Sequence, residues 1–167
     1  MRFAIALAVL LATVPALALD PSLSDAANQA YLTANSHKRG VVITRDGLQY
    51  RILQNGFGPR PSAYDMVTVY YKGALINGKV FDSTEPGLPS KFIVNKLIPG
   101  WTEALKLMRQ GDHWELVIPP ELAYGMRGVG DGLIPPGQAL VFDLQLVKVE
   151  PPPPSHDPND PNNQDGQ

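Results

Sequence analysis

The longest regular pattern in the chain is an alternation of apolar and polar residues near its C-terminal end. Residues 139–150 place four apolar side chains on one face of a strand, namely Leu140, Phe142, Leu144 and Leu146, because successive side chains of a strand point to opposite faces. Alternation or short apolar runs also predict strands over residues 47–53, 66–75, 91–95 and 113–119. The pattern therefore predicts five strands.

Two other segments carry apolar residues at helical spacing. The first begins at the capping residue Ser24, ends at Gly40 and has an apolar face of Ala27, Ala30, Tyr31 and Ala34. The second begins at Thr102 as cap and ends at Gly111. Five strands interrupted by one short helix predict an α+β domain, whose antiparallel, strongly curved sheet wraps around that helix.

The ends of the chain differ in composition from its middle. Residues 1–18 combine Arg2, an apolar run and a final Ala-Leu-Ala, the pattern of a secretory signal peptide. Residues 19–46 form an N-terminal arm with the short helix, and residues 47–150 hold the predicted domain. Residues 151–167, which begin with Pro-Pro-Pro-Pro, predict a disordered tail. We expect an exported protein, periplasmic or released, that does not span the membrane after signal cleavage.

Composition excludes several classes of function. The chain contains no cysteine, so disulfides and thiol chemistry are excluded. The net charge of -2 becomes about -3 when Arg2 leaves with the signal, and no basic run stands out. A nucleic-acid partner is therefore not expected. Binding should depend on shape and apolar surface.

The segment Pro99-Gly100-Trp101 places a tryptophan at the start of the predicted core helix. There its indole can form the floor of a cavity, although an ordinary core tryptophan is the alternative. Tyr71, Phe81, Tyr124 and Phe142 lie on four other elements that can each bring a ring to the same place. This convergence favours an apolar cavity for a small ligand or a peptide.

Rival chemistries have little support. The three histidines are scattered and no Gly-x-Ser-x-Gly turn occurs, so a hydrolytic triad is not expected. We expect His113 to be a surface residue of a strand. The tail segment 157–166 is faintly similar to a calcium loop but lacks the glycine at the sixth position from Asp160 and the closing glutamate, which favours a solvated tail.

Four separated motifs resemble the successive signatures of the FKBP-type peptidyl-prolyl isomerases. They are "VTVYYKGAL" followed by "NGKVFDS", then "LIPGWTEAL", "PPELAYG" and "IPPGQALVFDLQLVKV", in the order of the family. The segment "ANSHKRGVVITRDGLQY" is similar to the exported bacterial branch that includes the macrophage infectivity potentiators.

The resemblance implies a prolyl-binding cavity with Trp101 as its floor. It implies catalytic roles for Asp82, Tyr124 and Phe142, where the Tyr124 hydroxyl and the Ile98 amide bind substrate. The other implied substrate-binding residues are Tyr71, Phe81, Leu97, Ile98, Trp101, Leu133 and Ile134. A turn-forming role is the alternative for Asp82.

The same resemblance implies cis-trans isomerisation of X-Pro bonds in unfolded exported proteins and proline-containing peptides, with no cofactor or metal. Macrolide inhibitors of the family are a further expected ligand. The alternative is a peptide-binding module or holdase chaperone that uses the same groove without turnover.

Three features depart from the family pattern. Ser90 replaces an aromatic residue on one side of the site, the loop 82–90 offers no arginine to pair with Asp82, and the loop 125–136 is slightly longer and rich in glycine. The arm is also much shorter than the helical arm through which infectivity-potentiator relatives dimerise, so we expect a monomer.

Overall fold

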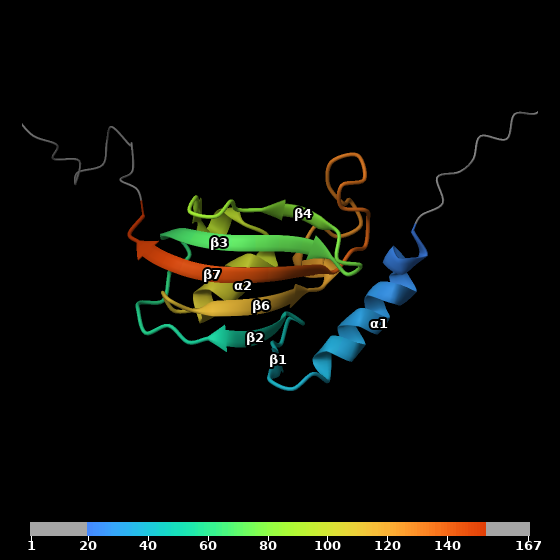
Figure 1. Ribbon diagram of the computed structural model, residues 1–167, viewed down its shortest axis with the longest axis horizontal. Helices are drawn as coiled ribbons and strands as arrows, with labels where there is room; N and C mark the ends of the chain where they lie inside the picture. The colour runs from blue at the N-terminus through green and yellow to red at the C-terminus, as the bar shows by residue number, and fades with distance from the viewer. Residues whose placement is uncertain (1–19, 153–167) are drawn as a thin grey trace, which may run out of the picture.

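The computed structural model describes residues 20–152 (Figure 1). The predicted signal over residues 1–18 and the predicted disorder beyond residue 152 lie outside the described residues. Between residues 20 and 152, no helix is long and apolar enough to cross a membrane.

One antiparallel sheet organises the fold. Its strands are β1 (Val41–Ile43), β2 (Gln49–Gln54), β3 (Met66–Leu75), β4 (Val80–Ser83), β5 (Ser90–Ile93), β6 (His113–Ile118) and β7 (Leu140–Glu150). The order is β1-β2-β6-β7-β3-β4, and β5 pairs with the first half of β3. The five predicted strands are confirmed. The two strands beyond these five, β1 and β4, have 3 and 4 residues. The turn signal "INGK" indicated a hairpin that returns through "VFDS", which is β4, whereas β1 is too short for periodicity to reveal.

The core lies between the sheet and the helix α2 (Pro99–Leu107), which Figure 1 shows behind the strands. The predicted inner face of β7 is confirmed, since Leu140, Phe142, Leu144 and Leu146 are all buried. The curved sheet around one short core helix agrees with the predicted α+β class.

The N-cap of the helix α2 lies four residues before Thr102, the cap that we expected. Its N-cap is Ile98, and Pro99 occupies the first helical position, where a missing N–H costs nothing. Thr102 does not cap the helix; its hydroxyl donates instead to the carbonyl oxygen of Val94, at 2.8 Å. Val94 belongs to the short helix η2 (Val94–Lys96).

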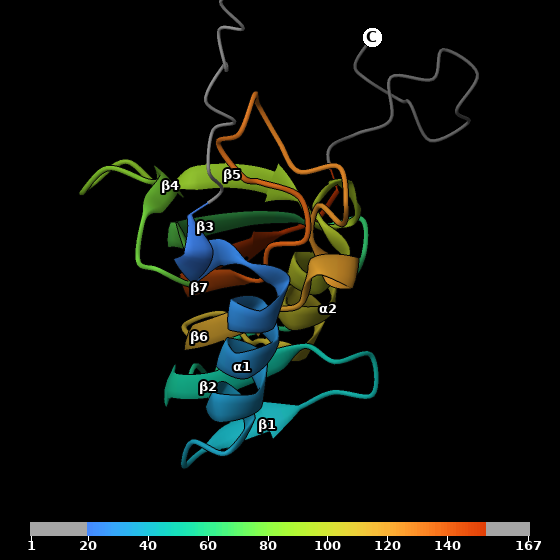
Figure 2. The same ribbon diagram turned by 90° about the vertical axis from the view of Figure 1, so that its right-hand side faces the viewer.

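The predicted N-terminal helix is α1 (Asp25–Ser36), preceded by the one-turn helix η1 (Pro21–Leu23). The predicted cap is confirmed, because the Ala27 amide donates to the Ser24 hydroxyl at 3.2 Å. The contact face differs from our expectation, since the residues of α1 that are buried are Asn28 and Asn35. Figure 2 shows α1 lying across the end of the sheet.

Over residues 47–53 the alternation predicts one buried face with Leu48, Tyr50 and Ile52, opposite a face with Gln49, Arg51 and Leu53. In β2 this prediction holds only in part. Leu48 is buried and Tyr50 stacks on Trp114 with ring centroids 4.4 Å apart, but Ile52 is exposed. Gln49 was expected to face solvent and is buried, because Asn35 of α1 donates a hydrogen bond to its side-chain oxygen at 2.9 Å. The docked arm thus reverses the burial that the strand pattern alone predicts.

Candidate active site

Trp101 lies in the first turn of α2, close to the sheet. Gly100 permits this approach, because a Cβ atom at that position would lie 2.5 Å from Cγ2 of Ile118 on β6. The Trp101 side chain is consequently only 4% exposed. It forms the base of a cavity rather than part of the solvent surface.

Three aromatic rings surround Trp101. The rings of Tyr71 and Phe142 each lie 5.2 Å from it, and Phe92 lies at 6.0 Å, all close to perpendicular. Phe81 extends the wall by packing edge-on against Phe142 at 5.6 Å. Such edge-to-face pairs are favourable beyond their buried area, so the cavity is held open by rings that fix one another.

Gly73 of β3 makes room for two of these rings. A Cβ atom there would lie 2.6 Å from Cε1 of Phe142 and 2.7 Å from Cζ of Phe81. Non-bonded carbon atoms do not approach one another that closely. Glycine at this position therefore allows the two walls to meet over the strand.

The cavity has a volume of about 300 Å³. It is lined by Tyr71, Phe81, Asp82, Phe92, Lys96, Leu97, Ile98, Trp101, Tyr124 and Phe142. Eight of the residues singled out from the sequence thus come together. Leu133 and Ile134 do not line it: Leu133 is exposed, and Ile134 is buried in the core and paired with Val129.

Sequence reasoning missed Phe92 and Lys96 as lining residues. Phe92 pairs with Val67 of β3, and the alternation in β3 predicts that Val67, Val69 and Tyr71 share its inward face. That register would have pointed to Phe92 had it been deduced. Lys96 ends η2, two residues before Ile98, and no sequence pattern distinguishes it from a surface lysine.

Two tyrosine hydroxyls accompany the aromatic walls. The Tyr71 hydroxyl donates to a carboxylate oxygen of Asp82 at 2.6 Å. Burial and this hydrogen bond raise the pKa of Tyr71 well above its usual value. Burial, followed by the charge of Asp82, also raises the pKa of Tyr124. Both phenols therefore stay protonated at neutral pH and can donate hydrogen bonds.

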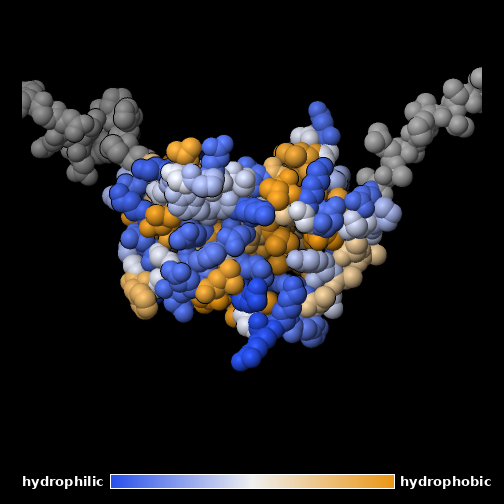
Figure 3. All heavy atoms as spheres, in the orientation of Figure 1, coloured by the Kyte–Doolittle hydropathy of each residue, from blue (hydrophilic) through white to orange (hydrophobic). Residues whose placement is uncertain are grey.

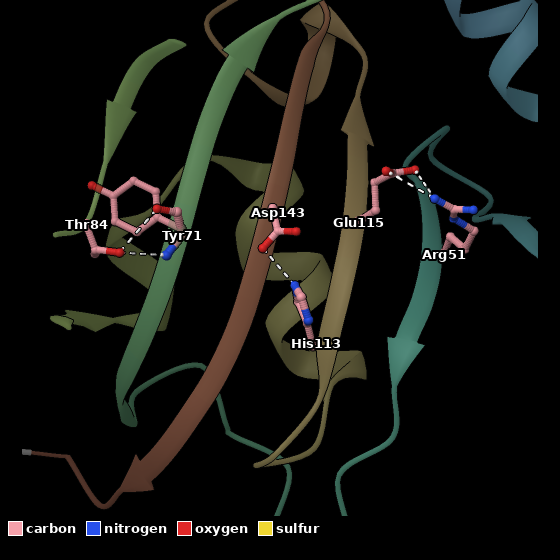
Figure 4. Close-up of polar contacts among 6 residues, drawn as sticks. All are labelled: Arg51, Tyr71, Thr84, His113, Glu115 and Asp143. Carbon is pink, nitrogen blue, oxygen red and sulfur yellow. Dashed lines mark hydrogen bonds and ion pairs between the residues drawn. The ribbon is translucent and has the colours of Figure 1, made fainter. Parts of the chain in front are cut away.

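The backbone around Tyr71 is fixed by Thr84. The Tyr71 amide donates to the Thr84 hydroxyl at 3.1 Å, and that hydroxyl donates to the Tyr71 carbonyl at 3.2 Å (Figure 4). Across the cavity, the Ile98 amide has no hydrogen-bond acceptor within residues 20–152. A lining residue with a free N–H suits an incoming carbonyl group.

The other polar pairs of the sheet lie apart from the cavity. Figure 4 shows His113 with Asp143, at 2.7 Å, and Arg51 with Glu115, at 3.3 Å, on strands β2, β6 and β7. The His113 side chain is partly exposed, in line with the expected surface position. None of these residues lines the aromatic cavity.

Two families match the chain. The family described as "FKBP-type peptidyl-prolyl cis-trans isomerase" matches residues 58–147. The family described as "Domain amino terminal to FKBP-type peptidyl-prolyl isomerase" matches residues 21–52, which include α1, β1 and most of β2.

Curated relatives are similar over most of this chain. "Outer membrane protein MIP" of Legionella longbeachae is 50% identical over 75% of this chain and 54% of its own length. The "FKBP-type 22 kDa peptidyl-prolyl cis-trans isomerase" of Escherichia coli is 51% identical over 71% of this chain and 58% of its own length. The chain thus spans little more than half the length of these relatives.

Solved structures share the fold. The crystal structure of FkpA from Escherichia coli has a TM-score of 0.74 and 44% identity, over 77% of this chain and 60% of that chain. A peptidyl-prolyl cis-trans isomerase from Pseudomonas syringae has a TM-score of 0.70 and 40% identity, over 75% of this chain and 92% of that chain. The chain belongs to the FKBP-type peptidyl-prolyl cis-trans isomerase family.

Proposed function

We propose that this protein is a peptidyl-prolyl cis-trans isomerase whose active site is the aromatic cavity over Trp101. The observation that carries the proposal is the set of rings held edge-on around Trp101 at 5.2–6.0 Å. The cavity is mostly apolar, of small volume and provided with few polar groups, the usual form of a site for a small apolar group. A proline ring on Trp101 fits that description.

The reaction requires no nucleophile. Resonance opposes rotation about the X-Pro bond with a barrier of about 18–20 kcal/mol, and a dry cavity removes the water that stabilises the planar, charge-separated amide. The Ile98 amide and the Tyr124 hydroxyl are placed to bind substrate carbonyl groups, as the family resemblance implies. Each 1.4 kcal/mol by which these contacts favour the twisted amide gives about a tenfold rate increase.

Asp82 is proposed to act beside the rotating amide. Its carboxylate is held by the Tyr71 hydroxyl at 2.6 Å, so its position is fixed although the residue is exposed. Phe142 is proposed to form a wall of the cavity whose shape favours the twisted amide over the planar one. Leu133 and Ile134 are less well supported, because they do not line the cavity.

The proposed substrates are proline-containing segments of unfolded proteins exported to the same compartment, the periplasm. Support comes from the signal-like residues 1–18 and from the relative named as an outer membrane protein. A monomer is proposed because α1 packs on its own domain through Asn28 and Asn35. Macrolide binding is proposed to be weakened by the open side at Ser90.

Refolding of a protein limited by proline isomerisation tests this function. The uncatalysed phase takes tens to hundreds of seconds, so an enzyme at far below the substrate concentration should shorten it. Asp82→Ala should lose most of the effect, and Phe57→Ala, at an exposed position outside the cavity, should keep it. An effect that requires one protein molecule per substrate molecule would instead indicate a holdase.

A further inference from the structure

The N-terminal arm is fixed against the segment that leads into β7. The Ala139 amide donates to the side-chain oxygen of Asn28 at 2.8 Å, and the Asn28 side-chain amide donates to Gln138 at 3.2 Å. Gln138 in turn donates to the carbonyl oxygen of Leu23 at 2.9 Å. Asn28 is only 2% exposed, and breaking a buried hydrogen-bonded pair is costly. The start of the arm is therefore a fixed surface of the domain.

A hollow of about 490 Å³ lies between this part of the arm and the loop 125–137. Pro21 and Leu23 line it on the arm side, and Met126, Pro135 and Pro136 line it on the loop side. Figure 2 shows the arm and the loop on the same side of the molecule. Figure 3 shows apolar residues interspersed with polar ones on the face of the molecule seen in Figure 1. We refer to this space as the arm–loop hollow.

The arm–loop hollow and the aromatic cavity are related through shared lining residues. Tyr124 lines both the aromatic cavity and a second depression, which extends over Met126 to Gly128. Met126 lines both that depression and the arm–loop hollow. Two residues thus join three hollows in sequence, from the proposed prolyl site to the arm.

Met126 is suited to contact varied apolar side chains. It is 74% exposed, and its unbranched, polarisable side chain adapts to different partners. The far end of the series is acidic, because Asp20 and Asp25 line the arm–loop hollow. Neither carboxylate forms an ion pair with a residue in the range 20–152.

We propose that the three hollows form one groove that binds the polypeptide flanking the substrate proline, with the arm as its far wall. The occupant is an extended segment with apolar residues next to the proline and a basic residue farther away, opposite Asp20 and Asp25. This inference rests on the proposed isomerase function and adds to it a substrate preference that depends on length and charge.

Two peptides with a central proline test the groove. One is a tetrapeptide and the other has about twelve residues, which extended can span roughly 40 Å; apolar residues flank its proline and lysine stands near both ends. Affinity and cis-trans exchange are measured for each by NMR. We expect the long peptide to bind at least tenfold more tightly, and its version with glutamate at the charged positions to lose most of that gain at low salt.

Met126→Asp should remove the advantage of the long peptide and leave the tetrapeptide within about twofold, because the change lies outside the aromatic cavity. Phe57→Asp is the matched control: Phe57 is 93% exposed and lines a separate hollow with Leu107 and Trp114. The groove is refuted if Met126→Asp affects both peptides equally or neither. Failure of the wild-type protein to accelerate exchange of either peptide would refute the isomerase function. In that case the affinities of the two peptides would still show whether the groove binds the longer one.

The two buried asparagines of α1 provide a second, paired test. Asn28 donates to Leu23 and to Gln138, which both line the arm–loop hollow. Asn35 is equally buried, at 2% exposed, but it donates at 2.9 Å to Gln49, which does not line that hollow. Asn28→Ala should therefore reduce the affinity of the long peptide several-fold, whereas Asn35→Ala should leave it unchanged. Equal effects of the two substitutions, after correction for any unfolded fraction, would contradict a wall formed by the arm.

Discussion

Gly73→Ala should damage the aromatic cavity by displacing two of its rings, while every side chain with a proposed role in the reaction keeps its chemical identity. The new methyl group would lie 2.6 Å from a ring carbon of Phe142 and 2.7 Å from one of Phe81. Ordinary carbon contacts are about 3.5–4.0 Å, so each of the two rings must move by roughly 1 Å. Phe142 is buried in the core, which leaves it little room to move.

The expected magnitudes follow from these contacts. Overpacking of a core costs about 1–3 kcal/mol, which urea unfolding followed by tryptophan fluorescence can measure. A displacement of about 1 Å in a catalytic geometry can cost about a hundredfold in rate. We therefore expect the acceleration of X-Pro exchange to decrease by a factor of about ten to a hundred, under conditions where the variant is fully folded.

A second substitution tests whether the loss of stability comes from the contact between the new methyl group and the rings. Phe81→Leu removes one of the two rings that the new methyl group meets, so the double variant should recover part of the lost stability, with a coupling energy of about 0.5–3 kcal/mol. Activity should not recover, because a wall of the cavity is missing. A Gly73→Ala protein with unchanged stability and activity within twofold of wild type would refute the close approach of the two walls.

The remaining predictions concern the polar groups and the assembly state. Tyr71→Phe removes the hydroxyl that holds Asp82; the exchange rate should fall about three- to tenfold with stability changed by less than about 1 kcal/mol, and a larger loss of stability would contradict a mainly positioning role. Because burial raises the pKa of Tyr71 and Tyr124, activity should stay constant from neutral pH to about 10, and a decline in activity below pH 9 would contradict protonated phenols. The unfolded chain releases its tyrosine protons near pH 10 while the folded protein retains them, so urea midpoints should fall as pH rises above about 10. Light scattering should give the mass of one chain, and a mass of two chains would contradict the proposed monomer.

The sequence predicted correctly those strands whose buried face packs against the core alone. The alternation in β7 holds from Leu140 to Leu146 because the side chains of that face are all buried in the core, and the strand was therefore predicted correctly. β2 is different, since the arm covers Gln49 on its outer face and Ile52 extends past the core. Burial there depends on a contact between segments distant in the sequence, which no local pattern contains.

The same limit applies to the site. Motifs over residues 66–83, 97–105 and 119–125 pointed to Tyr71, Phe81, Asp82, Trp101 and Tyr124, and all five line the cavity. Phe92 was missed because its place beside Trp101 depends on the pairing of β5 with β3. The arm was taken for a separate helix with an alanine face, because asparagine and glutamine side chains that bury one another resemble surface residues in a sequence.

The equilibrium exchange of short X-Leu-Pro and X-Phe-Pro peptides, observed by NMR line shape, tests the central claim most directly. It reports binding and acceleration in the same spectra. The structure predicts fast exchange with the wild-type protein, strongly reduced by Phe142→Ala and by Asp82→Ala and retained by Phe57→Ala. Peptide binding in the aromatic cavity with exchange no faster than in buffer would contradict the account and leave a fold that binds proline without isomerising it.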